Sequence, residues 1–121
     1  MPSDLKVMQD LCAFYYGKEH QLAKLQEELG ELSAAIARLQ QANEQALDYG
    51  FFVDEMFSEL ADVKNVMSQV VSLYSAEAIV KYKQRNKMRR QLDRITKELS
   101  TASVASQADE EDDGDELLPR M

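Results

Sequence analysis

Apolar residues recur along the chain at alternating steps of three and four, which is the period of an amphipathic α-helix. This rhythm predicts four helices, over about residues 4–16, 18–43, 53–73 and 77–99. Gly17 is the expected end of the first helix, and Ser3 and Ser75 are the expected N-caps of the first and the last. The predicted core stripes of the second and third helices are Leu22, Leu25, Leu29, Leu32, Ile36 and Leu39, and Met56, Leu60, Val63, Met67, Val70 and Tyr74.

The composition agrees with a helical fold. Long stretches are rich in strong helix formers, and the 121 residues include only two prolines and four glycines. Short links favour antiparallel neighbours, so we expect an all-α, antiparallel four-helix bundle that forms one domain over residues 1–99. A domain of this size buries only about two thirds of its unfolded surface, which favours a homo-oligomer.

The last part of the chain has a different character. From residue 100 onward small polar residues are followed by an acidic run, with too little apolar surface to offset the entropy of ordering. The sequence therefore predicts a disordered acidic tail over residues 100–121. This tail accounts for most of the net charge of −8, through Asp109, Glu110, Glu111, Asp112, Asp113, Asp115 and Glu116.

The only cysteine, Cys12, lies in an apolar stretch. A single cysteine excludes an intrachain disulfide and fits a reducing compartment, so Cys12 is expected to be a buried structural thiol. The N-terminus lacks the pattern of a secretory leader, and no run approaches the roughly 18 apolar residues that cross a bilayer. We therefore expect a cytoplasmic protein with no membrane contact.

Two pairs of acidic residues carry the candidate chemistry. Glu28 and Glu31 stand at positions i and i+3 of the second predicted helix, and Glu59 and Asp62 repeat this spacing on the third. Each acid directly precedes a residue of an apolar stripe, so antiparallel packing brings the four carboxylates together. Carboxylate oxygens are the ligands that Mg²⁺ requires, with Mn²⁺ as a substitute. A solvated acidic surface remains the open alternative, because Glu-x-x-Glu pairs are common on helices.

Other hydrolase and metal classes lack their necessary residues. A di-iron carboxylate bundle needs Glu-x-x-His motifs, whereas the only histidine, His20, has Gly17 three residues before it. No glycine-rich loop ends in Gly-Lys-Ser or Gly-Lys-Thr, which excludes a phosphate-binding loop enzyme. Nothing resembles the nucleophile turn of a serine hydrolase.

The acidic motifs resemble a known family. Glu27-Glu28-x-x-Glu31 followed by Glu59-x-x-Asp62 is similar to the signature of the MazG-like all-α nucleotide pyrophosphohydrolases, whose relatives include dimeric dUTPases and phosphoribosyl-ATP pyrophosphohydrolases. The likeness runs from about Tyr16 to Ile95. It implies a Mg²⁺-dependent enzyme that hydrolyses a nucleoside triphosphate, canonical or modified, to the monophosphate and pyrophosphate, with Glu28, Glu31, Glu59 and Asp62 as metal-binding and catalytic residues.

The resemblance also implies a substrate site. Gln21-Leu22-x-Lys24 precedes the acidic motif, and Lys87-x-x-Arg90-x-x-x-Arg94 is similar to a basic motif of small MazG-like proteins. The spacing puts the last three cations on one helix face, where they would hold the phosphates. A solvated basic face or a set of ion-pairing partners stays open. Nucleic-acid binding through this strip is disfavoured by the negative charge of the chain.

The expected function is therefore Mg²⁺-dependent pyrophosphohydrolysis of nucleoside triphosphates in nucleotide metabolism, by a homodimer or homotetramer. The competing hypothesis is a helical interaction protein without enzymatic activity, or an inactive MazG-like protein. The sequence does not specify the nucleobase, the sugar or the number of metal ions.

Overall fold

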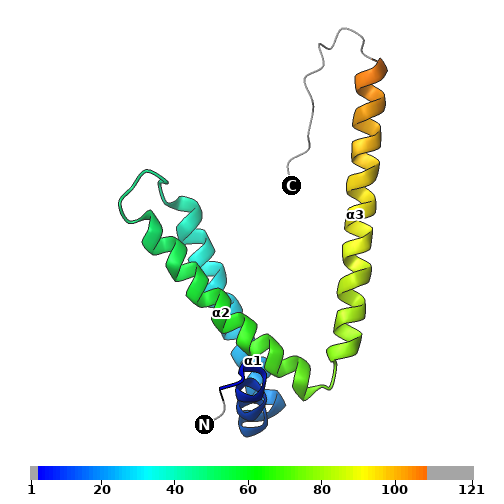
Figure 1. Cartoon of the computed structure of the whole chain (residues 1–121). Helices are drawn as coiled ribbons and strands as arrows, with labels where there is room; N and C mark the ends of the chain where they lie inside the picture. The colour runs from blue at the N-terminus through cyan, green and yellow to red at the C-terminus, as the bar shows by residue number, and fades with distance from the viewer. Residues whose placement is uncertain (1–2, 109–121) are drawn as a thin grey trace. The chain divides into compact units, whose positions relative to one another are not determined.

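A computed structural model describes residues 3–108, and these residues form three α-helices without a strand (Figure 1). The helices are α1 (Leu5–Gln41), α2 (Tyr49–Leu73) and α3 (Glu77–Ala108). The all-α class is thus confirmed. The chain divides into two units: Met1–Glu77 contains α1 and α2, which pack as an antiparallel hairpin, and Ala78–Met121 contains nearly all of α3. The four-helix bundle itself stays a prediction.

Helix α1 is broken at Gly17. This residue has φ 83° and ψ 174°, a conformation that is essentially restricted to glycine. The break falls where the first predicted helix was expected to end. Both parts of α1 reach α2, because Gln9 Nε2 donates a hydrogen bond to Asn65 Oδ1 (2.9 Å) and Gln21 Nε2 donates one to Gln69 Oε1 (2.5 Å).

The helix ends differ from two expectations. Asp4, rather than Ser3, is the N-cap of α1, since its carboxylate accepts the Val7 N–H at 3.0 Å. Ser75 ends α2 rather than capping α3: its φ of 51° is left-handed, and the N–H groups of Ser75 and Ala76 bond the carbonyls of Ser72 and Val71 at 3.0 and 2.9 Å. This is a Schellman motif, which satisfies the last carbonyls of a helix.

The seam between α1 and α2 only partly follows the predicted core stripes. On α1 the buried residues after the break are Gln21, Glu28 and Ala35, and on α2 they are Val63, Val66 and Gln69. Three of the six residues in each predicted stripe are exposed, with exposed fractions of 36% to 49%. We call these residues the apolar flank: Leu22, Leu29, Ile36, Leu60, Met67 and Tyr74. A single neighbouring helix covers only part of so wide a stripe.

Polar residues occupy the opposite side of the hairpin. On α1 the polar residues stand three positions after each seam residue, whereas the residues of the apolar flank stand one position after it. In a helix this difference puts the two sets on different sides. This charged flank consists of Lys24, Glu31 and Arg38 on α1 and of Glu55 and Asp62 on α2. Near the link that joins the helices, Arg38 Nε lies 2.6 Å from Glu55 Oε1. That ion pair helps to set the register in which α1 meets α2.

Three further expectations meet the structure. Cys12 is exposed rather than buried, because Ala13 is the residue of segment 5–16 that is buried against the rest of the hairpin. Helix α3 continues to Ala108, so residues 100–108 are helical instead of belonging to the tail; residues 109–121 lie outside the described part. Within residues 3–108 no helix is both long enough and apolar enough to cross a membrane.

Candidate metal centre and adjoining cavity

Four carboxylates meet on the hairpin of α1 and α2. Glu28 and Glu31 come from α1, Glu59 and Asp62 come from α2, and one oxygen of each lies within 4.8 Å of the others. The i, i+3 spacing puts each pair on one side of its helix, and the antiparallel packing brings the pairs together. The convergence that the sequence predicted is therefore present in the structure.

Two of these carboxylates hold oxygens that have no partner. Glu28 is only 5% exposed, and while its Oε1 lies 3.1 Å from Lys24 Nζ, its Oε2 is buried without a hydrogen bond. Glu59 Oε2 is also buried without a hydrogen bond. A buried polar oxygen that lacks a partner costs roughly 1–3 kcal/mol, and a charged one costs more. The hairpin bears this cost at the point where the four carboxylates converge.

The electrostatic field of the cluster is strongly negative. The charge of Glu28 raises the pKa of Glu31 above its ordinary value of 4.5, and burial and the charge of Glu59 act in the same direction. The pKa of the Lys24 ammonium group is raised as well, first by its hydrogen bond to Glu28 and then by the charge of Glu27. For a lysine, a raised pKa means that the charged form is favoured. Lys24 is the one cation among the described residues that is paired with a carboxylate of the cluster.

The oxygen set fits a hard divalent cation. Oxygens on opposite sides of an octahedral Mg²⁺ stand about 4.2 Å apart, because each bond is about 2.1 Å long. The four oxygens lie within 4.8 Å of one another, so small side-chain movements bring them to that spacing. Glu31 and Asp62 are exposed and free to make such movements, whereas Glu28 is held in the seam.

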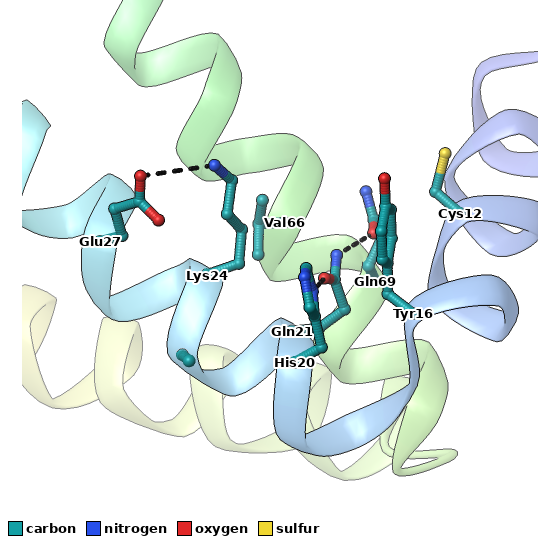
Figure 2. A pocket seen from close by; sticks show the side chains of 9 residues that line it. Cys12, Tyr16, His20, Gln21, Lys24, Glu27, Val66 and Gln69 are labelled. Atoms are coloured by element: carbon teal, nitrogen blue, oxygen red, sulfur yellow. Dashed lines mark hydrogen bonds and ion pairs between the residues drawn. The ribbon is translucent and has the colours of Figure 1, made fainter.

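A cavity of about 530 Å³ adjoins the cluster (Figure 2). Its walls come from both parts of α1 and from α2, and its lining residues are Cys12, Tyr16, His20, Gln21, Ala23, Lys24, Glu27, Val66 and Gln69. Lys24 connects the cavity with the cluster, because its Nζ lies 3.6 Å from Glu27 Oε1 and 3.1 Å from Glu28 Oε1. Gln21 and Lys24, the two substrate-binding residues expected on this helix, both line the cavity.

Sequence reasoning missed Gln69 and the stacking of Tyr16 on His20. Gln69 is 7% exposed and pairs with the buried Gln21 across the seam. The rings of Tyr16 and His20 stack at 4.4 Å with an angle of 13° between their planes. Gln69 had a recognisable signal, since it is a polar residue between the apolar positions Val66 and Val70. The stack depends on the backbone geometry at the Gly17 break. The spacing of apolar residues indicates where the helix ends but not this geometry.

The three expected phosphate-binding cations lie on α3. Lys87, Arg90 and Arg94 are exposed, and the helical backbone puts them on one face as their spacing predicted. Among residues 3–105 none of them lies in an ion pair. Because α3 belongs to the second unit, the approach of these cations to the carboxylates stays a prediction.

Comparisons of the chain with protein-family models, with curated proteins and with solved structures found no match. The function is therefore inferred from the residues of the cluster and the cavity. The resemblance of the acidic motifs to the MazG-like signature adds to this inference as an expectation.

The repulsion within the cluster predicts a pH dependence of stability. Folding raises the pKa of Glu31, so the folded chain binds this proton more tightly than the unfolded chain does. In a chelator, the stabilisation from Glu31 protonation should be present at low pH and be lost as the pH rises through the folded pKa, which lies above 4.5. We expect Glu31→Gln to flatten this part of the melting-temperature profile between about pH 4.5 and 7.5.

The matched control is Glu44→Gln, which removes a carboxylate from the link between α1 and α2. It should leave the profile parallel to that of the unsubstituted protein. Equal slopes for Glu31→Gln and Glu44→Gln would show that the cluster exerts no repulsion on Glu31.

Proposed function

We propose that this protein is a Mg²⁺-dependent nucleoside triphosphate pyrophosphohydrolase, which releases a nucleoside monophosphate and pyrophosphate. The observation that carries the proposal is the pair of buried, unpartnered oxygens of Glu28 and Glu59 within a cluster of four carboxylates. A hydrogen-bond donor from the protein would have satisfied these oxygens at lower cost. A divalent cation at the cluster would contact such oxygens and offset part of the negative charge of the four carboxylates.

The residues around the cluster suit phosphate chemistry. When bound, Mg²⁺ neutralises phosphate charge and lowers the pKa of a coordinated water. The carboxylates of Glu28, Glu31, Glu59 and Asp62 hold it, and the burial of Glu28 fixes the position of one ligand. The Lys24 ammonium, at the border of cluster and cavity, supplies a further positive charge for a phosphate oxygen.

A triphosphate carries about four negative charges, more than one lysine and one metal ion neutralise. Lys87, Arg90 and Arg94 are exposed on one face of α3 and have no ion-pair partner among residues 3–105, so they are available for phosphate oxygens. The MazG-like resemblance supports the same assignment. We propose that these three cations bind phosphate oxygens of the substrate.

The direct test is a screen for pyrophosphate release. Purified protein with Mg²⁺ should release equal amounts of monophosphate and pyrophosphate from at least one canonical or modified nucleoside triphosphate, and Mn²⁺ should replace Mg²⁺. Glu59→Gln keeps the size of the side chain and removes a metal ligand, so we expect kcat/KM to fall by at least about 100-fold. Asp54→Asn, on the same helix but outside the cluster, should retain activity.

Absence of pyrophosphate release from every nucleotide would support the competing hypothesis of a protein without enzymatic activity. Release that survives Glu59→Gln would instead contradict the assignment of the site. Release of inorganic phosphate in place of pyrophosphate would contradict the proposed position of cleavage.

We further propose that the protein is a homodimer in which two hairpins form an antiparallel four-helix bundle through their apolar flanks. The six large side chains of this flank are 36% to 49% exposed in one chain, which is unusual for residues at core spacing on two adjacent helices. Pairing of two hairpins covers them. It also leaves the charged flank, which lies on the other side of each hairpin, open to a nucleotide.

Light scattering coupled to gel filtration tests the bundle. The unsubstituted protein should have the mass of a dimer, or of a tetramer built from two dimers, at micromolar concentration. Introducing charges by Leu29→Glu together with Met67→Glu should give monomers, because a charge inside an apolar interface lacks a partner. The control Leu11→Glu changes an exposed leucine outside the apolar flank and should leave the mass unchanged. A monomeric unsubstituted protein would contradict the dimer.

A further inference from the structure

The cavity beside the carboxylate cluster has a polar wall made of two buried amides. Gln21 and Gln69 are 3% and 7% exposed, and Gln21 Nε2 donates a hydrogen bond to Gln69 Oε1. His20 Nδ1 lies 2.7 Å from Gln21 Oε1. Because an amide oxygen only accepts, His20 Nδ1 is the donor of this second bond. The hydrogen bonds therefore run in one direction, from His20 through Gln21 to Gln69.

This direction decides which group Gln69 offers to a ligand. The amide oxygen of Gln69 accepts the hydrogen bond from Gln21. The NH₂ group of Gln69 therefore remains free for a ligand. Figure 2 shows this nitrogen on the side of the amide that points away from Gln21, and Gln69 is one of the residues that line the cavity. The cavity thus presents a fixed hydrogen-bond donor on Gln69. The buried Gln21 holds this side chain in place, and His20 in turn holds Gln21.

A second wall of the cavity is aromatic. Tyr16 and His20 stand on either side of the break at Gly17 and stack at 4.4 Å with nearly parallel planes. Such a pair offers a flat surface to a planar ring. The cavity volume of about 530 Å³ lies within the range of about 300–1,000 Å³ that is usual for small-molecule sites.

The third feature is the distance to the carboxylate cluster. Gln21 and Glu28 are two helical turns apart on α1, which corresponds to about 10.5 Å. Lys24 stands between them and contacts Glu27 and Glu28. The site therefore suits a ligand with a planar, hydrogen-bonding end and a polyanionic end, joined by a short spacer.

We propose that this cavity binds the nucleobase of the substrate and selects bases whose pairing edge presents a ring carbonyl beside an N–H, as in uracil, thymine and guanine. The Gln69 NH₂ donates a hydrogen bond to that carbonyl. Cytosine and adenine present an amino group at the same place, so two hydrogen-bond donors would face each other. The base lies against Tyr16 and His20. The phosphate end of this assignment rests on the proposed function, but the base end rests on the cavity alone.

The exposed thiol of Cys12 provides a test that needs neither metal nor turnover. Cys12 is the only cysteine of the chain and lines the cavity, so a bound nucleoside should slow its reaction with a chromogenic disulfide reagent. The probes are two matched pairs, uridine with cytidine and inosine with adenosine, which differ in the edge that Gln69 reads. Uridine and inosine should protect Cys12 at concentrations at least about tenfold lower than their partners.

Two substitutions of Gln69 separate recognition from folding. Gln69→Met should remove the preference within each pair, and Gln69→Glu, which replaces the donor by an acceptor, should reverse it in favour of cytidine and adenosine. Gln26→Met, an exposed glutamine of α1, is the control and should preserve the original preference. Melting curves show whether each variant is folded.

Lack of protection by all four nucleosides would overturn the proposal. Equal protection within both pairs, or a preference that Gln69→Glu leaves unchanged, would overturn the assignment of Gln69. The assay contains no triphosphate and no Mg²⁺, so its outcome is independent of the pyrophosphate screen. A failure of the base site and a failure of the proposed activity are therefore distinguishable.

Discussion

The central constraint in this structure is the burial of two carboxylate oxygens that lack a hydrogen-bond partner among the described residues. Glu28 occupies a seam position between α1 and α2, where an apolar residue would pack at no electrostatic cost, and its Oε2 and that of Glu59 have no hydrogen-bond donor. The only described cation paired with the cluster is Lys24, which reaches one oxygen of Glu28. A fold that retains such an arrangement gains from a ligand that supplies positive charge, and a divalent cation does so most compactly.

Helical periodicity puts the apolar flank and the charged flank on different sides of the hairpin. Residues one position after the α1 seam form the apolar flank, whereas residues three positions after it belong to the charged flank. The proposed assembly through one side would leave the other side free for the proposed chemistry. The break at Gly17 adds a third element, because it returns the first part of α1 to α2 and so places Tyr16 and Cys12 at the cavity. In the proposed function, base, phosphate and metal would occupy adjacent places along one helix.

The sequence predicted those features that depend on local spacing. The i, i+3 acids, the helical class and the break at Gly17 follow from residue types and intervals, and the structure agrees with them. On α1 the seam was predicted one residue away from its place, because large leucines dominate a periodic pattern while Gln21, Glu28 and Ala35 make the actual contact; on α2 the predicted Val63 does lie in the seam. The exposure of Cys12 and the Gln21–Gln69 pair depend on tertiary packing. The N-cap at Asp4 and the left-handed Ser75 depend on backbone geometry that a residue type does not fix.

Crystals soaked in Mn²⁺ would show directly whether the four carboxylates bind a cation, since the anomalous signal of the ion reports its position independently of the protein density. We predict an anomalous peak between α1 and α2, coordinated by carboxylate oxygens of Glu28, Glu31, Glu59 and Asp62. A well-occupied peak elsewhere on the protein, with no peak at these four residues, would contradict it.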